Sequence, residues 1–221
     1  MKMFKIIMVS AIALFSTSCQ SKNKDQKPRV DKVAYNAQDL KEYETAYFAS
    51  GCFWCVEAVF ESVKGVKEVI SGYAGGTELN PTYEQVAMGQ TSHAEAVEVY
   101  YDPKVVSYET LVKVFFGSQD PTTLNRQGPD RGAQYRSVAF YKNEGEKKVI
   151  VDYIAKLTKD KVYNNPIVTE VTPFTKFYVA EDYHQDYERK HPNNPYIQGV
   201  SVPRLKRFQK KFPELLKTDA H

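Results

Sequence analysis

The order of short apolar strands and amphipathic helices between residues 45 and 157 constrains the fold of this chain more than any other feature. Apolar runs that end at glycine, aspartate or proline predict strands, and apolar residues three and four positions apart predict helices. In chain order we expect a strand at 46–49, a helix at 53–63, strands at 66–74 and 94–101, a helix at 107–116 and a strand at 136–141. This β-α-β, loop, β-α-β order predicts an α+β fold, a ferredoxin-like split βαβ two-layer sandwich with its helices on one face.

The rest of the chain adds an extension at each end of this domain. A third amphipathic helix is expected from about Glu144 to Leu157, followed by a loop-rich C-terminal extension with a strand at Ile167–Val171 and a basic helix from about Pro203. We expect one folded domain, because 221 residues with 42% apolar composition suit a single core. The predicted parts are a signal peptide at 1–18, a polar tether at 19–44, the domain at 45–200 and the basic helix at 201–221.

Charge and cysteine content exclude several classes of protein. The chain has 30 basic and 27 acidic residues, and Lys2 and Lys5 are the only charged residues before position 19, so the remainder has 30 − 2 = 28 basic residues against 27 acidic ones. A nearly neutral body predicts no nucleic-acid partner, which would require a concentrated basic field. Three cysteines are too few for a disulfide scaffold or for a four-cysteine zinc site. We expect a monomer that holds no metal.

The N-terminus has the pattern of an export signal. Lys2 and Lys5 precede a ten-residue apolar run at 6–15, which is too short to span a bilayer but suits a signal peptide. The following Ser16-Thr17-Ser18-Cys19 resembles a bacterial lipoprotein box in which Cys19 would become the lipidated N-terminus, although serine stands where leucine is usual. Ordinary secretion with cleavage nearby and an uncleaved anchor are the alternatives. We therefore expect an exported protein, periplasmic or on the cell surface, held at the membrane as a lipoprotein.

The segment Ser50-Gly51-Cys52-Phe53-Trp54-Cys55 lies where a buried strand ends and a helix begins. Free N–H groups and the positive end of the helix dipole stabilise a thiolate at such a position, which favours ionisation of Cys52. Cys55 lies one helical turn further on, close enough to form a disulfide with Cys52. A pair of structural cysteines is the alternative interpretation, and a zinc site is disfavoured because no second ligand pair has matching spacing. The pattern indicates redox chemistry.

The strand at 94–101 contains an acidic residue whose position is informative. Glu95 shares strand parity with Val97 and Val99, so all three side chains point to one face. If that face is the core side, burial raises the pKa of Glu95, and a carboxyl that stays protonated near neutral pH can donate a proton. The alternative is a glutamate at the strand end that reaches solvent.

Two loop segments rich in turn residues contain further polar candidates. Tyr83 follows Asn80-Pro81-Thr82, and Asp130 and Tyr135 lie in the run 126–136. The two tyrosines can each supply a phenolic hydrogen bond, and the aspartate can hold a substrate amide. Taken alone these signals are weak, because a tyrosine at a strand edge usually serves only packing.

Seven motifs together resemble one enzyme family, peptide methionine sulfoxide reductase A, over about residues 45–200. In order they are Gly51-Cys52-Phe53-Trp54, Gly72-Tyr73-Ala74-Gly75-Gly76, Asn80-Pro81-Thr82-Tyr83, His93-Ala94-Glu95-Ala96-Val97, Tyr101-Asp102-Pro103, Asp130-Arg131-Gly132-Ala133-Gln134-Tyr135-Arg136-Ser137 and Ala180-Glu181-Asp182-Tyr183-His184-Gln185. The resemblance implies thiol-dependent reduction of methionine S-sulfoxide, free or in oxidised proteins. It implies that Cys52 is the nucleophile and that Phe53 and Trp54 wall a pocket for the S-methyl group.

The resemblance also implies roles for the polar candidates. Glu95, with Tyr83 and Tyr135, would bind and protonate the sulfoxide oxygen, and Asp130 would contact the substrate backbone. A sulfoxide oxygen leaves poorly until it is protonated, so attack on sulfur needs a thiolate at the sulfur and a neutral acid at the oxygen.

The chain departs from the commonest pattern of this family in its cysteines. Cys55 stands where many members have glycine, and the C-terminal resolving cysteines of many members are absent. With Cys19 used for lipid, Cys55 is the remaining cysteine that can convert a Cys52 sulfenic acid to a disulfide, which an external thioredoxin-like dithiol would reduce. No bound cofactor is expected.

Two other classes of function remain open from the sequence. A thioredoxin-like thiol-disulfide oxidoreductase would also place a Cys-x-x-Cys pair at a helix start after a strand, but it would have no use for Glu95 on an apolar face. A non-enzymatic exported lipoprotein would tolerate Cys52→Ser without loss of function.

Overall fold

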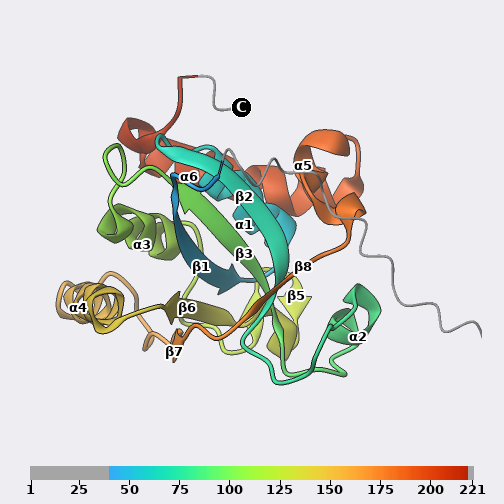
Figure 1. Ribbon diagram of the computed structural model, residues 1–221. Coiled ribbons are helices and arrows are strands. Elements are labelled where there is room, and N and C mark those ends of the chain that lie inside the picture. Colours follow the sequence, from blue (N-terminus) through green and yellow to red (C-terminus); the bar gives the residue numbers. More distant parts are fainter. Residues whose placement is uncertain (1–39, 219–221) are drawn as a thin grey trace, which may run out of the picture. The chain divides into compact units, whose positions relative to one another are not determined.

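Six strands form one mixed sheet in the computed structural model, which describes residues 40–218. The strands are β1 (Glu44–Ser50), β2 (Val66–Ala74), β3 (Ala94–Tyr101), β6 (Ser137–Tyr141), β7 (Glu170–Pro173) and β8 (Phe177–Val179). Their order across the sheet is β7-β6-β1-β3-β2-β8 (Figure 1). The α+β class predicted from the sequence is confirmed.

Four of the five strands expected from the sequence lie side by side as β6-β1-β3-β2, and all three of their pairings are antiparallel. The C-terminal extension supplies the two edge strands. β8 pairs antiparallel with β2, whereas β7 pairs parallel with β6, which makes the sheet mixed. The register sets Phe48 opposite Val97, so the end of β1 lies beside the beginning of β3.

The main helices are α1 (Phe53–Glu61), α3 (Tyr108–Gly117), α4 (Glu144–Lys159) and α6 (Val202–Lys211). Ser107 caps α3 by accepting a hydrogen bond from the Thr110 amide, and Asn143 caps α4 in the same way. Each begins where the sequence predicts a helix, because a capping side chain precedes the apolar stripe at both positions.

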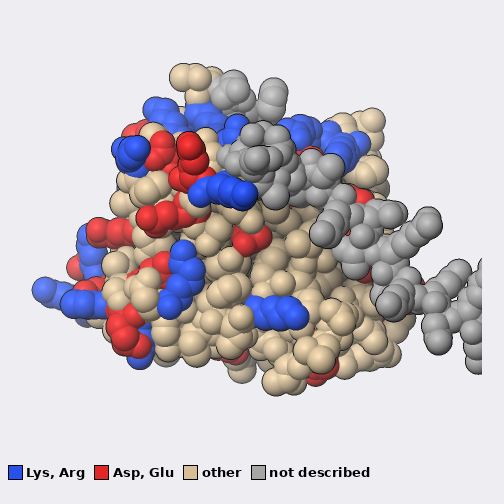
Figure 2. Space-filling model, viewed as in Figure 1, with Lys and Arg blue, Asp and Glu red and all other residues tan. Residues whose placement is uncertain are grey.

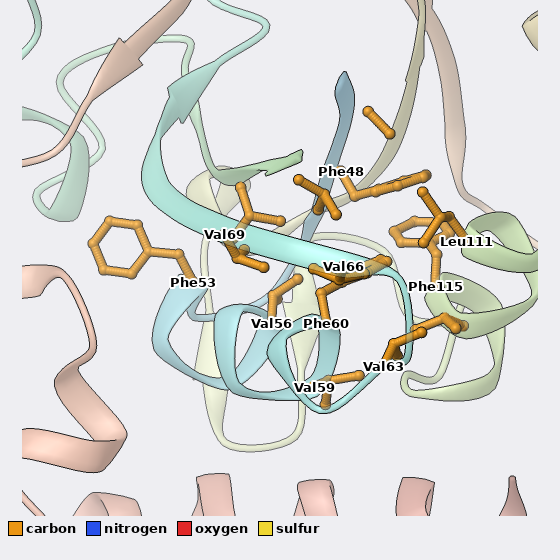
Figure 3. Close-up of a cluster of buried hydrophobic side chains, with 14 of the residues drawn as sticks. Phe48, Phe53, Val56, Val59, Phe60, Val63, Val66, Val69, Leu111 and Phe115 are labelled. Atoms are coloured by element: carbon orange, nitrogen blue, oxygen red, sulfur yellow. The ribbon is translucent and has the colours of Figure 1, made fainter. Parts of the chain in front are cut away.

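One large apolar core joins these helices to one face of the sheet. Phe48 of β1 stacks on Phe60 of α1 and on Phe115 of α3, with ring centroids 5.1 Å apart in both pairs (Figure 3). Val97 and Val99 of β3 belong to the same cluster and are fully buried. Burying each of these large side chains contributes about 1.5–3 kcal/mol to folding.

The opposite face of the sheet is also covered, by the segment around β7 and β8 rather than by helices. Ala94 and Ala96 of β3 and Tyr47 of β1 form a smaller buried cluster there, packed by Phe174 and Phe177. Phe174 stacks on Tyr47 with ring centroids 3.7 Å apart. The small alanines allow the segment between β7 and β8 to lie close against this face.

Three local features differ from the sequence prediction. The polar loop after β2 contains a short helix, α2 (Tyr83–Ala87), which a capping box between Thr82 and Gln85 stabilises. The run 126–136 contains a hairpin of β4 (Arg126–Gln127) and β5 (Asp130–Arg131). The strand predicted at Ile167–Val171 lies at Glu170–Pro173. All three are too short for periodicity to locate.

The basic C-terminal helix packs against the domain. α6 contacts α1, and it buries Leu205 and Phe208 as well as the charged Arg204. No helix of residues 40–218 combines the length and apolar character that crossing a bilayer requires. On the face drawn in Figure 2, positive and negative side chains are interspersed rather than gathered by sign.

Candidate active site

The turn between β1 and α1 presents both described cysteines. Ser50 ends β1, Gly51 has a φ of +79°, and Cys52 is the N-cap of α1. A Cβ on Gly51 would lie 2.6 Å from the Cβ of Gln127, so both the backbone angle and the space require glycine here. Cys52 is 7% exposed, Cys55 is 2% exposed, and both are free thiols.

Glu95 lies on the face of β3 that packs on α1, as its parity with Val97 and Val99 predicts. Its side chain is 2% exposed, and its carboxylate accepts a hydrogen bond of 3.1 Å from the amide of Phe53, the first residue of α1. Burial raises the pKa of Glu95 to about 8, against the lowering effect of hydrogen bonds from the Phe53 amide and the Cys52 thiol. Glu95 is therefore mostly protonated at neutral pH.

The thiol of Cys52 differs from the expectation of a thiolate at the helix start. Burial raises its pKa well above 9.0, and the hydrogen bond with Cys55 and the charge of Glu95 raise it further. The Trp54 amide opposes this shift, but the Phe53 amide is occupied by Glu95. A helix N-terminus that already serves one carboxylate stabilises a second anion less, so burial determines the ionisation of Cys52.

Cys55 has the opposite tendency. A hydrogen bond from Cys52 is the largest effect and lowers the pKa of Cys55 to about 7, although burial acts against it. The charge of Arg204 and the hydroxyls of Ser201 and Tyr196 act in the same direction as Cys52. The Tyr196 hydroxyl lies 3.7 Å from the Cys55 sulfur. The second cysteine of the pair is thus the more acidic thiol.

Tyr83 and Tyr135 converge on the same two groups. Both are half-buried, and after burial the charges of Glu95 and Cys52 are the next causes that raise the pKa of each phenol, to about 12 for Tyr83. Among residues 40–218 neither hydroxyl has a hydrogen-bond partner, whereas the Tyr83 amide donates to Glu181 at 3.0 Å. Both phenols are free to donate to an incoming oxygen atom.

An aromatic cluster surrounds the start of α1. Phe53 is 1% exposed and its ring lies 5.0 Å from that of His184. Trp54 is half-buried, stacks on Tyr187 at 3.7 Å and donates a hydrogen bond of 3.2 Å from Nε1 to Nδ1 of His184. The Nε2 atom of His184 is buried without a partner among the described residues, and burial lowers the pKa of this imidazole to about 4. His184 is therefore neutral.

Asp130 lies across the site from Glu95. It is half-buried, and its carboxylate accepts a hydrogen bond of 2.6 Å from the hydroxyl of Tyr196, the same hydroxyl that lies beside Cys55. Burial raises its pKa, while Tyr196 and Arg204 lower it. The structure thus brings all of the site residues expected in the domain into one region.

Comparison with known proteins identifies the family. Residues 44–216 match the family profile described as peptide methionine sulfoxide reductase. The chain belongs to the peptide methionine sulfoxide reductase family. It is 51% identical over 174 residues to peptide methionine sulfoxide reductase MsrA 1 of Rhodopirellula baltica, covering 79% of this chain and 90% of that protein.

Solved structures agree with this assignment to the reductase family. Methionine sulfoxide reductase A of Corynebacterium diphtheriae superposes with a TM-score of 0.62 at 36% identity, covering 69% of this chain and 76% of that one. Mxr1 of Saccharomyces cerevisiae in its reduced form gives 0.63 at 34% identity, covering 69% and 88%. This reductase is a peptide-methionine (S)-S-oxide reductase, which reduces methionine S-sulfoxide to methionine.

Sequence reasoning missed several residues that shape the reductase site. Glu181 accepts hydrogen bonds from the Tyr83 amide and from the Tyr73 hydroxyl, and Tyr196 joins Asp130 to Cys55. Arg204 belongs to the basic helix predicted from about Pro203, and nothing in its sequence context predicts its burial. The cluster of aromatic and acidic residues at 174–187 is the signal that could have pointed to this region, but spacing alone does not show which of these side chains face the cysteines.

The described residues contain one cluster of potential metal ligands, and neither cysteine belongs to it. Glu57, Glu61 and Asp186 place one carboxylate oxygen each within 4.8 Å of the others. The oxygens of Glu57 already accept hydrogen bonds from the Ser71 hydroxyl and the Asp186 amide. Glu57 thus anchors residues 180–186 to α1, and this cluster is explained by the fold.

Proposed function

We propose that Cys52 is the nucleophile of this reductase, that Glu95 is its proton donor and that Cys55 resolves the oxidised intermediate. One observation carries the proposal: the N-terminus of α1 holds the Cys52 thiol and the Glu95 carboxyl together, with Glu95 accepting hydrogen bonds from the Phe53 amide and from Cys52. Sulfoxide reduction requires a thiolate at the sulfur and a neutral acid at the oxygen, and this pair supplies both once it has lost one of its two protons.

In the first step the Cys52 sulfur attacks the sulfoxide sulfur while Glu95 gives a proton to the sulfoxide oxygen. The pair has lost one proton before the attack, so Cys52 attacks as a thiolate, and Glu95 ends the step as a carboxylate that regains a proton from solvent. The oxygen moves from methionine to Cys52, the methionine sulfur gains two electrons and the Cys52 sulfur loses two. The products are methionine and a Cys52 sulfenic acid.

In the second step Cys55 attacks the sulfenic sulfur, which forms the Cys52–Cys55 disulfide and releases the oxygen as water. An external thioredoxin-like dithiol then reduces this disulfide by exchange and is itself oxidised. The adjacency of the two thiols in the reduced protein supports this assignment. The route needs no bound cofactor and no metal.

The remaining site residues bind the substrate. Tyr83 and Tyr135 donate hydrogen bonds to the sulfoxide oxygen, because their hydroxyls are free and lie near Glu95. Phe53 and Trp54 provide the apolar wall for the S-methyl group, and Asp130 contacts the backbone of the oxidised protein. Free methionine sulfoxide binds in the same site without the backbone contact to Asp130.

Reduction of an S-sulfoxide peptide with dithiothreitol tests the nucleophile. Cys52→Ser should abolish turnover, whereas Cys55→Ser, one turn away in the same helix, is the matched control and should still release one equivalent of methionine per protein. Turnover by Cys52→Ser near the wild-type rate would remove Cys52 as the nucleophile. A thioredoxin-like exchanger would instead leave the sulfoxide unreduced in every variant.

We further infer that the protein is exported and that Cys19 is lipidated, with residues 19–44 as a tether between the membrane and a monomeric domain. The apolar run and the residues before Cys19 support this inference, and they lie outside the described residues. Mass spectrometry of the native N-terminus should find a chain that begins at a lipid-modified Cys19. An unmodified N-terminus elsewhere would refute the lipid anchor.

We also infer that β1-α1-β2-β3-α3-β6 follows the split βαβ plan of ferredoxin-like sheets. The strand order β6-β1-β3-β2 with antiparallel pairings supports this, as does the location of α1 and α3 in one core. Deleting β7 and β8 tests it, because an independent plan should retain the four-stranded sheet by circular dichroism, and loss of the strand signal would contradict it.

A further inference from the structure

Arg204 is a charged residue in an unusual place. It lies on α6, which runs beside α1 (Figure 1), and only 6% of it is exposed. Its guanidinium donates to the Ser50 carbonyl at 2.8 Å, to the Ser50 hydroxyl at 2.9 Å and to the Ser118 carbonyl at 2.8 Å. A Cβ on Gly51 would lie 3.6 Å from one of its nitrogens. The charge therefore lies directly behind the turn that carries the cysteines.

Arg204 makes no ion pair among the described residues, although it acts on the charge of Asp130. The three hydrogen bonds go to neutral oxygens, and none of the ion pairs within residues 40–218 includes Arg204. A cation removed from water is unfavourable unless an opposite charge accompanies it. The half-buried Asp130 and the thiols of the site are therefore the groups left to balance this charge.

The groups that this charge acts on are the reactive ones. Burial lowers the pKa of Arg204, and the neighbours that oppose this effect are, in order, Cys55, Tyr196, Cys52 and Asp130. Cys55 comes first among them, and Arg204 is the only cation among the main causes that shape the pKa of Cys55. The other groups around the Cys55 sulfur are neutral hydroxyls and a thiol, with two carboxyl groups nearby: Glu95 faces it from β3, and Asp130 accepts the hydrogen bond of the Tyr196 hydroxyl beside it.

We propose that Arg204 is a positioning residue for the second half of the reaction: its buried charge holds Cys55 as a thiolate ready to attack the Cys52 sulfenic acid. The proposal rests on the resolving role of Cys55 stated above. The three hydrogen bonds fix the guanidinium to Ser50 and Ser118, so the charge keeps its place while the cysteines react. Arg204 does not touch the sulfoxide.

The charge assists two bond changes. When the Cys55 thiolate attacks the Cys52 sulfur, an S–S bond forms, the S–O bond breaks, and hydroxide leaves and takes a proton to become water. When an external thiolate later attacks Cys52, the S–S bond breaks and Cys55 departs with the electron pair. A cation beside Cys55 stabilises that leaving thiolate, and the more acidic thiol leaves faster.

Titration of the first thiol to ionise, followed by absorbance at 240 nm, tests the proposal in the full chain carrying Cys19→Ser. Cys52 is retained, because its hydrogen bond is the largest effect that lowers the pKa of Cys55 and its own pKa lies well above 9.0. We expect a midpoint near 7 with Arg204 in place. Arg204→Lys, which keeps the charge, should leave the midpoint low. Arg204→Gln, which can still donate hydrogen bonds but is neutral, should raise it by about one pH unit or more.

Two outcomes would overturn the proposal. The first is a Cys55 midpoint at or above pH 9 in the protein that retains Arg204, and this result can be obtained even if Arg204→Gln does not fold. Equal midpoints for the lysine and glutamine variants would reduce Arg204 to a structural role. In the same chains, rapid-quench measurement of disulfide formation should show Arg204→Gln about tenfold slow at pH 6.5 and normal at pH 9.

The titration does not depend on whether Cys55 resolves the intermediate, so the two proposals fail separately. If Cys55→Ser recycles normally with a dithiol of the thioredoxin type, the resolving role is wrong whatever the midpoint of Cys55. If Cys55 forms the disulfide but its titration midpoint does not change when the charge at position 204 is removed, only the role of Arg204 is wrong.

Discussion

The pH dependence of the first half-reaction follows from the shared site of Glu95 and Cys52. Attack requires a thiolate and a neutral acid, so the reactive pair holds one proton in total. With a pKa of about 8 for Glu95, and a still higher one for Cys52, both groups are protonated below that value. The form with one proton is then about 1% of the protein at pH 6, about 10% at pH 7 and about half at pH 8, and the reactive arrangement, with that proton on Glu95, is a constant fraction of it. We therefore expect kcat/KM to rise about 50-fold from pH 6 to pH 8.

Glu95→Gln removes the acid and the first ionisation together. The rate at pH 8 should fall by about 10²–10⁴-fold, the usual contribution of a general acid. The rise in the pH–rate profile should shift to higher pH and follow the ionisation of Cys52 itself, because burial keeps the pKa of Cys52 above 9.0. Glu95→Asp is the matched control, because it retains a carboxyl on a side chain one methylene shorter. This variant should still show the rise in rate near pH 8.

Single-turnover methionine release gives this profile without interference from recycling. Each variant is mixed with a sub-saturating S-sulfoxide peptide in the absence of reductant between pH 6 and 10, and circular dichroism verifies folding at each pH. A wild-type rate that is flat from pH 6 to pH 8 would refute the one-proton pair. A glutamine variant with the wild-type profile would show that Glu95 does not donate the proton.

Three further predictions follow from other contacts. Cys55→Ser should complete one turnover but recycle poorly with thioredoxin, and normal recycling in a coupled assay would contradict its assignment. Tyr83→Phe should lower kcat with little change in melting temperature, because the lost hydroxyl has no partner within residues 40–218; a large loss of stability would show that it does. Glu57→Ala should leave the Ser71 hydroxyl and the Asp186 amide unpaired and lower the free energy of unfolding by about 1–3 kcal/mol for each. Glu57→Gln should lower it less, and equal urea midpoints for the two variants would refute the anchoring role.

The spacing of apolar residues predicted those helices and strands that are long enough for the spacing to repeat. The parity of Glu95 with Val97 and Val99 was sufficient to assign its face, because a strand alternates its side chains regardless of context. The burial of Glu95 then followed from the face. The short helix α2 and the edge strand β7 were missed or displaced, because four or five residues do not establish a period.

Contacts between distant segments could not be predicted in this way. The sequence indicates a free helix N-terminus at Cys52, yet the Phe53 amide is taken by a residue 42 positions away. Arg204 reads as one basic residue among several on an amphipathic helix, and only the packing of α6 shows that it is buried. Both errors concern charge, because the partner of a buried charge is set by tertiary structure rather than by local pattern.

The register of the sheet explains why the acid and the nucleophile meet. β1 and β3 run antiparallel with Phe48 opposite Val97, so the start of β3 lies at the sheet end where β1 leads into α1. A slip of one residue would turn Glu95 to the opposite face, away from Cys52.

The same placement limits what one helix start can do. Its first amide serves Glu95, and the burial that keeps Glu95 protonated also opposes a resting thiolate on Cys52. On the proposed route the Cys52 thiolate forms only in the state of the pair that has lost one proton, with Glu95 holding the proton that remains. The second step then requires a thiolate on Cys55, after Glu95 has already given up its proton in the first step. A separate buried cation on α6 meets that need, which is why the two halves of the reaction should respond differently to pH and to Arg204→Gln.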